Sequence, residues 1–262
     1  MEKSYALITG ASGGIGRAIA FEFASAGHNI ILVARSRDSL EKLGRELAEQ
    51  YGIDAMAIAM DLSAENAARD LDRRTEDRRV DNLVNNAGFG DHGVFLDSDP
   101  AKQNRMIRLN VTALTELTYY FGRRMRADGG GRILNIASAA AFCAGPYMSC
   151  YYATKAYVLS FSQAVAEELR GTGVTVTALC PGPVSTGFEK AAGMQKPFAL
   201  LRPKTAEAAA RRGYKAMQKG KAVACLGASV KLLDIGCRLA PRKTARKISK
   251  RINGIPAPFS ET

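Results

Sequence analysis

Short runs of apolar residues alternate along this chain with longer segments in which apolar residues recur every three or four positions. The short runs predict buried strands at Tyr5–Thr9, Ile30–Ala34, Ala55–Met60, Asn82–Asn85, Arg132–Ala137, Val174–Cys180 and Ala222–Leu226. The periodic segments predict helices, the clearest of them at Gly14–Ala26, Ser39–Tyr51, Lys102–Met125 and Tyr151–Arg170. Strands separated by helices of this length favour an α/β fold: a single doubly wound parallel sheet with helices on both faces.

The chain shows no internal repeat and no low-complexity linker, so we expect one main domain over residues 1–227 and a basic helical tail over 228–262. An irregular insertion is expected at about residues 186–203. In the tail, Pro241 should divide the helical stretch Ala228–Ile252 into two short helices, because proline cannot continue the hydrogen-bond pattern of a helix.

Three features favour a cytoplasmic location. No apolar run reaches about 18 residues, so no spanning helix is expected. Residues 1–9 lead directly into a strand and do not resemble a signal peptide. The five cysteines form no Cys-x-x-Cys pair, which indicates reduced thiols. His, Cys and Asp residues also lack the spacing of metal ligands, so no metal is expected.

The net charge of +12 is concentrated in the last part of the chain. Residues 190–262 hold 17 Lys and Arg against 3 Asp and Glu, whereas residues 1–189 hold 20 against 22. A basic tail of this kind favours an anionic partner or forms a solvated face. Its apolar residues, such as Leu232 and Leu239, lie among the basic ones. Two readings stay open: peripheral contact with an anionic membrane, or a cap on the substrate cleft or on a dimer interface.

A glycine-rich turn joins the first predicted strand to the first predicted helix. Glycine allows the chain to turn sharply there and lets a pyrophosphate approach the backbone, while the free N–H groups at the helix start face the anion. A glycine pattern alone is common, but at this junction it indicates dinucleotide binding. The residues expected to hold the phosphates are Gly10, Ser12, Gly13, Gly14, Ile15 and Gly16.

The end of the second strand predicts which dinucleotide is bound. An acidic residue at this position would bond the ribose 2′-hydroxyl of NAD, whereas arginine accommodates the 2′-phosphate of NADP. Arg35 follows the strand directly and no acid stands at the junction, although Asp38 is near. We therefore expect NADP (NADPH) rather than NAD, with Arg37 and Arg17 as the next residues to consider.

Five signatures occur in order along the chain: the Thr9-Gly-x-x-x-Gly-x-Gly16 turn, Asp61, Asn85-Asn-Ala-Gly88, Ser138 followed by Tyr151-x-x-x-Lys155, and the stretch Pro181–Thr186. Through them the chain resembles the short-chain dehydrogenases/reductases over residues 4–226. The resemblance implies a Rossmann fold and an oxidoreductase that moves a hydride between the nicotinamide and a carbonyl or alcohol carbon, and Arg35 favours NADP as its cofactor.

Tyr151 and Lys155 have the spacing that this chemistry requires. A carbonyl oxygen needs a proton while hydride reaches its carbon, and free tyrosine has a pKa near 10. Lys155 lies one helical turn from Tyr151, so its ammonium should lower the pKa of that phenol. Tyr152 is a geometric competitor, because residues three apart are also neighbours on a helix. The family spacing selects Tyr151.

The resemblance assigns the remaining roles. Ser138 would hold the substrate oxygen, Lys155 would also bond the nicotinamide ribose, and Asn110 would interrupt its helix and bind a water that links Lys155 to solvent. Asp61 would bond the adenine amino group. The other positions expected at the cofactor are Leu62, Asn86, Ala87, Gly88, Pro181, Gly182, Val184 and Thr186.

Three variable segments should form the substrate pocket: Phe89–Ser98, Ala139–Cys150 and Thr186–Pro203. They are rich in apolar side chains, which suggests a ketone, an aldehyde or a 3-oxoacyl substrate with a long chain, a sterol-like ring system or bulky substituents. The residues concerned are Phe89, Phe95, Phe142, Tyr147, Met148, Phe188, Met194, Phe198, Leu200 and Leu201.

Apolar residues on more than one side of the helices Lys102–Met125 and Tyr151–Arg170 predict a homodimer or homotetramer, since similar enzymes pair these helices with a symmetry mate. The residues noted are Leu109, Leu114, Leu117, Val158, Phe161 and Val165. Two other functions compete with catalysis: a catalytically silent NADP(H)-binding sensor or scaffold, and a nucleic-acid binder. The intact Ser138, Tyr151 and Lys155 set argues against the first. The lack of any nucleic-acid-binding signature argues against the second.

Overall fold

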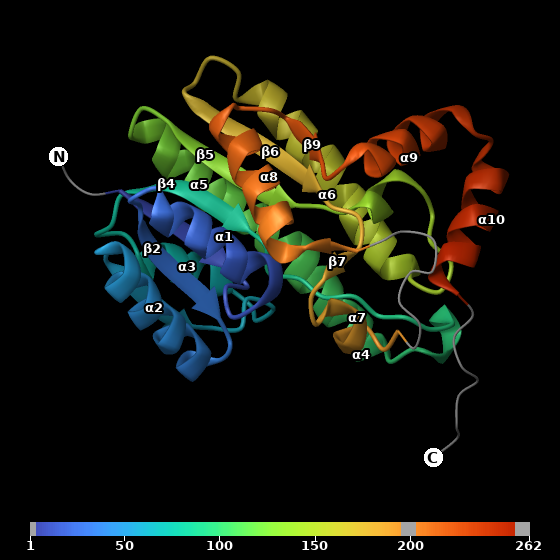
Figure 1. Ribbon diagram of the computed structural model, residues 1–262, viewed down its shortest axis with the longest axis horizontal. Helices are drawn as coiled ribbons and strands as arrows, with labels where there is room; N and C mark the ends of the chain where they lie inside the picture. Colours follow the sequence, from blue (N-terminus) through green and yellow to red (C-terminus); the bar gives the residue numbers. More distant parts are fainter. Residues whose placement is uncertain (1–3, 195–202, 255–262) are drawn as a thin grey trace.

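The computed structural model describes residues 4–194 and 203–254. Within them, seven parallel strands form one sheet in the order β3-β2-β1-β4-β5-β6-β9 (Figure 1). The strands are β1 (Tyr5–Thr9), β2 (Asn29–Ala34), β3 (Ala55–Ala59), β4 (Val80–Asn85), β5 (Gly131–Ile136), β6 (Val174–Cys180) and β9 (Val223–Cys225). All seven lie where the apolar runs predicted them. The two-residue strands β7 (Val184–Ser185) and β8 (Lys204–Thr205), which pair with each other, were not predicted.

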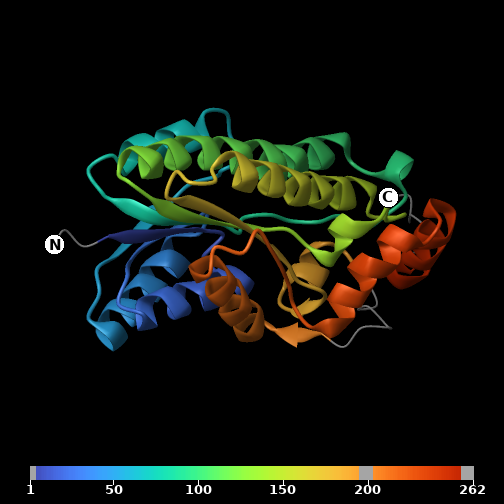
Figure 2. The ribbon, with the colours of Figure 1, turned by 90° about the horizontal axis from the view of Figure 1, so that it is seen from above.

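Helices cover both faces of the sheet, which confirms the predicted doubly wound architecture. One face carries α1 (Gly14–Ser25), α2 (Arg37–Tyr51) and α8 (Ala206–Gln218). Figure 2 shows the opposite layer, formed by α3 (Ala67–Arg74), α5 (Leu114–Ala127) and α6 (Ser149–Glu168). Each layer seals one face of the sheet from water.

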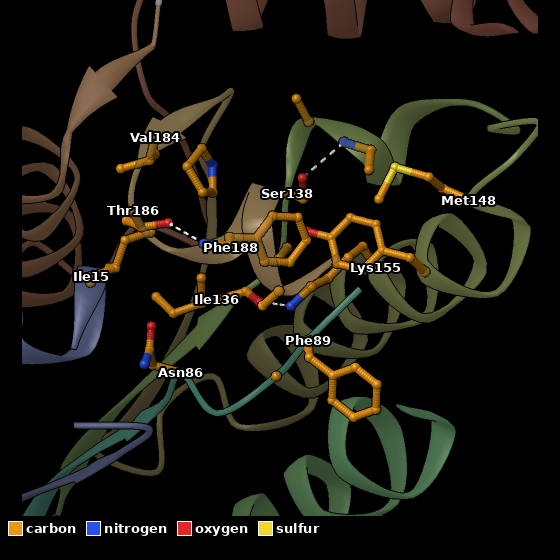
Figure 3. A pocket seen from close by; sticks show the side chains of 18 of the residues that line it. Ile15, Asn86, Phe89, Ile136, Ser138, Met148, Lys155, Val184, Thr186 and Phe188 are labelled. Carbon is orange, nitrogen blue, oxygen red and sulfur yellow. Dashed lines mark hydrogen bonds between the residues drawn. The ribbon is translucent and has the colours of Figure 1, made fainter. Parts of the chain in front are cut away.

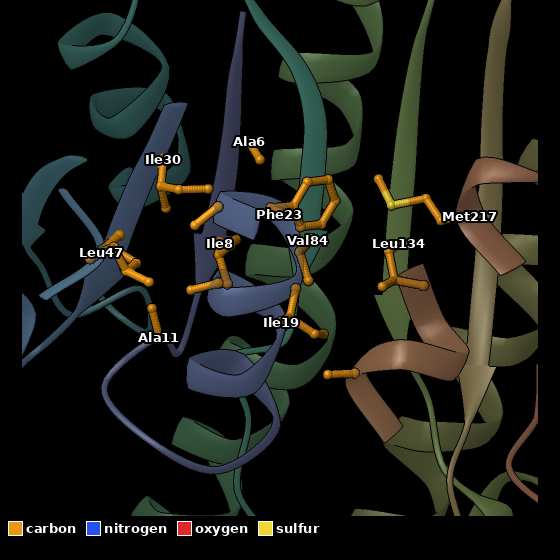
Figure 4. Close-up of a cluster of buried hydrophobic side chains, with 14 of the residues drawn as sticks. Ala6, Ile8, Ala11, Ile19, Phe23, Ile30, Leu47, Val84, Leu134 and Met217 are labelled. Carbon is orange, nitrogen blue, oxygen red and sulfur yellow. The ribbon is translucent and has the colours of Figure 1, made fainter. Parts of the chain in front are cut away.

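The core is built from the inner faces of these layers. On the α1 side, Phe23 and Ile19 of α1 pack against Ile8 of β1, and all three side chains are fully buried (Figure 4). On the other side, Phe121 of α5 packs in a second cluster with Leu83 of β4. Burying a large apolar side chain contributes about 1.5–3 kcal/mol, so these two layers hold the sheet rigid beneath the site.

The strand order places a crevice at the carboxyl edge of the sheet. Strand β1 pairs with β2 on one side and with β4 on the other, so the chain changes direction at β1. Loops that leave the ends of such strands diverge and leave room for a ligand. Most of the predicted site residues follow soon after β1, β2, β3, β4, β5 and β6, so the fold brings them to this edge, while Asn110, Tyr151 and Lys155 come from η2 (Arg108–Ala113) and α6.

The long helix predicted over Lys102–Met125 consists of three elements. Helix α4 (Pro100–Ile107) begins at Asp99, whose side chain accepts a hydrogen bond from the backbone N–H of Ala101. A π-helical turn, η2 (Arg108–Ala113), follows and leads into α5. A π-helical turn contains one residue more than an α-helical turn. It therefore shifts the apolar positions that follow by only one residue, which the periodicity of the sequence does not reveal. Asn110 lies within this turn.

The tail forms two helices, α9 (Ala228–Leu239) and α10 (Arg242–Asn253), with the break at Pro241 as predicted. Both lie at one end of the molecule, beyond the carboxyl ends of the strands (Figures 1 and 2). Three short elements complete the described structure: η1 (Phe95–Asp97), η3 (Ala139–Phe142) and α7 (Phe188–Ala191). None of the helices in the described ranges is long and apolar enough to span a bilayer.

Candidate active site

A cavity of about 1200 Å³ opens at the carboxyl edge of the sheet (Figure 3). Most of the residues predicted for the site line this single space. They are Gly10, Ser12, Gly13, Gly14, Ile15, Arg35, Asp61, Leu62, Asn86, Ala87, Gly88, Ser138, Tyr151, Lys155, Pro181, Gly182, Val184 and Thr186. Gly16 and Asn110 are the other two predicted residues. They do not line the cavity themselves but lie next to residues that do, Gly16 beside Gly10 and Asn110 beside Gly88.

The glycine turn is tight enough to require glycine at two positions. Gly10 has a φ of 65°, in the left-handed region that favours glycine. A Cβ on Gly16 would clash with the carbonyl oxygen of Gly10 and would lie 2.5 Å from the side-chain nitrogen of Asn86. Among the described residues, no side chain caps the start of α1 at Gly13, so its free N–H groups face the cavity. The turn fits a phosphate group.

Asn86 supports this turn from the neighbouring strand. Its side-chain amide donates to the carbonyl oxygens of Thr9 at 3.0 Å and of Gly10 at 3.1 Å. The hydroxyl of Thr9 accepts from the backbone N–H groups of Asn86 and Ala87, both at 3.0 Å. These four bonds tie the ends of β1 and β4 together. The structure therefore assigns Asn86 a scaffold contact in addition to its place on the cavity wall.

Arg35 and Asp61 lie at the end of the cavity beyond β2 and β3. The Arg35 side chain is exposed, and among the described residues no carboxylate is paired with it. Arg17, by contrast, donates to both carboxylate oxygens of Glu46, at 2.9 and 3.0 Å. Arg35 is thus better placed than Arg17 to meet an anion in the cavity.

The carboxylate of Asp61 accepts two hydrogen bonds from Ser63, from its N–H at 2.9 Å and from its hydroxyl at 2.7 Å. Burial alone would raise the pKa of Asp61, but these bonds and the charges of Arg35 and Arg105 hold it below its usual value. Asp61 is therefore a carboxylate at neutral pH, and it can accept hydrogen bonds from a ligand.

Ser138 and Tyr151 face the cavity from different elements. Ser138 lies between the end of β5 and the start of η3. Its hydroxyl accepts a hydrogen bond from the backbone N–H of Ala140 at 3.1 Å (Figure 3). Tyr151 lies in the first turn of α6. Burial raises the pKa of Tyr151 to about 12, and its hydrogen bond with Ser138 acts in the opposite direction. Tyr151 therefore carries its proton at neutral pH.

Lys155 is buried beneath Tyr151. Its ammonium donates to the carbonyl oxygen of Ile136 at 2.7 Å (Figure 3) and lies 5.8 Å from the centre of the Tyr151 ring. Burial lowers the pKa of Lys155 to about 8. We expected Lys155 to lower the pKa of Tyr151. In this structure the pKa of Tyr151 rises instead, because the desolvation of the buried phenol outweighs its hydrogen bond with Ser138.

Asn110 lies behind Lys155 and is almost fully buried. Its side-chain amide donates to the carbonyl oxygen of Phe89 at 2.9 Å and to the hydroxyl of Thr154 at 3.2 Å, while its oxygen accepts from the N–H of Phe89 at 3.1 Å. A Cβ on Gly88 would lie 2.9 Å from the oxygen of Asn110 and 3.7 Å from the Lys155 nitrogen. Asn110 and Lys155 thus converge on Gly88.

The predicted substrate residues are only partly brought together. Phe89, Met148 and Phe188 line the cavity, and the Phe188 ring lies 5.2 Å from that of Tyr151. Phe95 does not join them, because its side chain is 55% exposed at the surface. Phe142 packs in the core next to Val158, and Met194 packs next to Ala192. Tyr147 lies against His92, and Phe198, Leu200 and Leu201 are outside the described residues.

The tail supplies residues that the sequence prediction did not place in the site. Part of the cavity wall comes from α9 and α10, through Ser229, Leu232, Leu233, Gly236, Cys237, Ala245, Ile248, Ser249 and Ile252. The spacing of Val230, Leu233 and Cys237 could have indicated a buried helical face, because residues three and four positions apart lie on the same side of a helix. In the described part of the chain no three metal-ligating side chains gather.

Comparisons with known proteins agree with this geometry. The family model described as short chain dehydrogenase matches residues 4–197. A 17-beta-hydroxysteroid dehydrogenase type 3 of Mus musculus is 34% identical over 191 residues, which are 71% of this chain and 62% of that protein. A very-long-chain 3-oxoacyl-CoA reductase of the same species is 32% identical over 197 residues, 74% of this chain and 62% of that protein. The chain thus covers less than two thirds of the length of these two relatives.

A solved structure extends the similarity over nearly the whole chain. It is a short-chain dehydrogenase of Sphingobium yanoikuyae in complex with NADPH, 33% identical, with a TM-score of 0.82. The similarity covers 90% of this chain and 93% of that one. The arrangement of strands and helices described above is therefore shared with an experimentally determined dehydrogenase.

Proposed function

The chain belongs to the short-chain dehydrogenase/reductase family of oxidoreductases, and from this premise we propose that it uses NADP(H) to interconvert an apolar ketone, aldehyde or 3-oxoacyl compound with its alcohol. One observation carries the proposal. A phosphate-binding turn, an arginine at the ribose end, and the side chains of Ser138, Tyr151 and Lys155 all line a single cavity. Family membership makes the protein an NAD(P)-dependent enzyme.

The cofactor would occupy the half of the cavity nearest β1 and β2. The free N–H groups at the start of α1 would hold the pyrophosphate, and Asp61 would accept from the adenine amino group. Arg35 would pair with the 2′-phosphate that distinguishes NADP from NAD. A relative of known structure binds NADPH, which supports this choice. When bound, the nicotinamide supplies or accepts the hydride.

The proton would move through Tyr151. Because its pKa is raised to about 12, the phenol holds a proton at neutral pH and is ready to donate it to a substrate oxygen. Ser138, bonded to the same phenol, would hold that oxygen in place. The pKa of Lys155, about 8, lies above neutral pH, so Lys155 would be mostly protonated there, and its hydrogen bond to the carbonyl of Ile136 would keep its nitrogen below the tyrosine ring.

The cavity wall favours an apolar substrate. Phe89, Met148 and Phe188 come from the body of the enzyme, and Leu233 and Ile252 come from the tail. Relatives named for a steroid and for a very-long-chain 3-oxoacyl thioester support a large apolar substrate. The competing function, a silent NADP(H) sensor or scaffold, does not require Ser138, Tyr151 and Lys155 to converge as they do here.

Two further proposals concern the surroundings of the enzyme. We propose that it forms a homodimer or homotetramer through the exposed faces of α5 and α6. We also propose that the exposed apolar and basic residues of the tail contact an anionic membrane from the cytoplasm. The five cysteines are free thiols, which suits a reducing compartment.

Replacing Tyr151 by phenylalanine tests the reaction. We expect Tyr151→Phe to lower kcat by about 10²–10⁴-fold, the usual contribution of a general acid or base, while NADPH still binds. The assay is NADPH oxidation with a panel of ketones, aldehydes and 3-oxoacyl thioesters, and fluorescence titration gives the cofactor affinity. Tyr152→Phe is the matched control and should keep its kcat. Near-normal activity of Tyr151→Phe would exclude this phenol as the proton donor.

A further inference from the structure

The last residue of α10, Asn253, is buried to 3% exposure and binds three separate segments of the enzyme. Its side-chain oxygen accepts from the hydroxyl of Tyr152 at 2.7 Å, and its side-chain nitrogen donates to the carbonyl oxygen of Pro146 at 2.8 Å. Its backbone carbonyl lies 3.0 Å from Nε2 of His92. A carbonyl oxygen only accepts, so the His92 nitrogen is the donor.

These partners surround the reacting end of the cavity. Tyr152 is the neighbour of Tyr151 in α6, and the two rings lie 6.3 Å apart. Pro146 belongs to the segment that joins Ser138 to Tyr151, and the following residue, Tyr147, has a φ of 68°, which is unusual for a residue with a side chain. His92 lies on the loop after β4, which is joined to the same segment by the bond from the Gly93 N–H to the Tyr147 carbonyl at 2.8 Å.

The helices held in this way form a wall of the cavity. Leu233 and Cys237 of α9 and Ile252 of α10 face the space that Ser138 and Tyr151 also line. At the near end of the tail, a Cβ on Gly182 would lie only 3.0 Å from the Val230 side chain, so α9 is packed closely there. The tail therefore contacts the body of the enzyme near both of its ends, through the packing of Val230 against Gly182 and through the hydrogen bonds of Asn253.

We propose that Asn253 is a positioning residue that clasps the tail over the cavity and so determines how well the enzyme binds large apolar substrates. This proposal rests on the proposed oxidoreductase function. A small substrate held by Ser138 and Tyr151 has no need of the tail. A long or bulky one extends from the reacting end to Leu233 and Ile252, and loses contact area when the tail is loose.

The chemistry of the side chain explains why asparagine stands here. The amide offers an acceptor to Tyr152 and a donor to Pro146 at the same time, without a charge in a buried place. Leucine would remove the acceptor that Asn253 offers to the Tyr152 hydroxyl and the donor that it offers to the Pro146 carbonyl. Buried groups left without a partner weaken the structure that held them, so the tail should separate from the body more often.

The test compares two ketones that differ only in length, 2-hexanone and 2-dodecanone, with NADPH. We expect Asn253→Leu to raise the KM for 2-dodecanone about tenfold, while KM for 2-hexanone and both kcat values stay within about twofold. Tyr152→Phe, which removes only the hydroxyl, should act in the same direction, and the double variant should be no worse than Asn253→Leu alone. Thr244→Ala, an exposed change on the same helix, is the control.

Hydrogen–deuterium exchange on the full chain provides a readout that needs no turnover. Faster exchange should appear over residues 242–253 and 144–149 of Asn253→Leu, with β1 and β4 unchanged. Equal effects on both ketones, or no effect on either, would overturn the proposal. If the wild-type enzyme reduces neither ketone, the proposed function fails for this substrate class. Unchanged exchange in α10 would then overturn the clasp independently.

Discussion

Lys155 and Tyr151 show how burial and charge compete within a few ångströms. Burial raises the pKa of the phenol to about 12 and lowers that of the ammonium to about 8, so at neutral pH Tyr151 is neutral while Lys155 is still mostly protonated. Proton transfer from Tyr151 leaves a phenolate, which a nearby cation must stabilise. The hydrogen bond of Lys155 to Ile136 keeps this cation below the ring. We propose that this arrangement lets Tyr151 give up its proton when a substrate oxygen accepts it.

Arg35 should decide which dinucleotide the enzyme prefers. Changing Arg35→Asp replaces a cation that lines the cavity by an anion, which should repel a 2′-phosphate. The loss of a charge-assisted contact to a phosphate corresponds to about 2–3 kcal/mol in kcat/KM for NADPH, with NADH relatively favoured. Arg37→Asp is the control, since Arg37 lies two residues away, pairs loosely with Glu41 at 3.7 Å and is exposed. If Arg35→Asp keeps the preference for NADPH, another residue recognises the phosphate.

Individual residues differed in how well the sequence predicted them. The glycine turn could be predicted from its place between a strand and a helix, whereas helix geometry left both Tyr151 and Tyr152 open and the family spacing selected Tyr151; the glycine turn, Tyr151 and Lys155 all line the cavity. Asn253 has no such signal, because a lone asparagine near the end of a basic segment looks like any other polar residue. Its partners lie 101 and 107 positions away in sequence, and only the folded chain brings them together.

At the scale of elements, strands were predicted better than helices. Each strand of the main sheet is a short apolar run, the central ones almost wholly buried and the edge strands β3 and β9 only partly, and this pattern is visible in the sequence alone. The periodicity of α4, η2 and α5 is continuous, so only the family resemblance predicted an interruption at Asn110, and the structure has a π-helical turn there. Strands β7 and β8 are too short to form a pattern.

The outer faces of α5 and α6 should form a subunit interface. Of the residues noted for this purpose, Leu114, Leu117 and Val158 are buried against the sheet and cannot meet a partner. Tyr119 and Tyr157 can, because their side chains are 56% and 40% exposed. The Tyr157 ring stacks on Phe161 at 5.6 Å, so an aromatic surface is already ordered. A stable interface needs about 800 Å² from each partner, which two long helices can supply.

Light scattering at micromolar concentration tests this interface. We expect at least twice the chain mass of 28.1 kDa for the wild type, and the mass of a single chain for Tyr119→Glu/Tyr157→Glu. The double variant places two charges against their own symmetry copies, which opposes association. Gln50→Glu, on the exposed side of α2, is the control. A wild-type mass of one chain would contradict the prediction.

The whole molecule has an uneven distribution of charge. Residues 1–189 are close to neutral, while residues 190–262 carry 17 basic and 3 acidic side chains. The division into a domain over residues 1–227 and a tail over 228–262 stays a proposal, and the packing of α9 and α10 on the cavity argues that the tail does not act alone. The capping role that the sequence left open for the tail agrees with its place on the cavity wall. One side of α9 and α10 lines the cavity, and the opposite side is exposed at the surface.

The free side of the tail has the composition of an interfacial membrane contact. Ile235 and Leu239 are 45% and 82% exposed on α9, and neither lines the cavity. Arg242, Lys243 and Lys247 are exposed on α10. Basic residues near an anionic bilayer contribute about 1 kcal/mol each, and salt screens this attraction. Apolar side chains beside them would enter the headgroup region. A membrane would also hold the apolar substrates that we propose for the cavity.

Co-sedimentation with vesicles decides whether this surface binds lipid. We expect the full-length protein to sediment with vesicles of mixed phosphatidylserine and phosphatidylcholine, much less with phosphatidylcholine alone, and less again as salt rises. Because the tail forms part of the cavity, point variants are better than truncation. Ile235→Ser/Leu239→Ser and Lys243→Gln/Lys247→Gln should each weaken binding several-fold while NADPH oxidation in solution stays unchanged. Lys42→Gln/Arg45→Gln, on α2, removes the same charge from the opposite part of the molecule. If this control weakens binding as much as the tail variants, the attraction reflects net charge and the tail is not the contact.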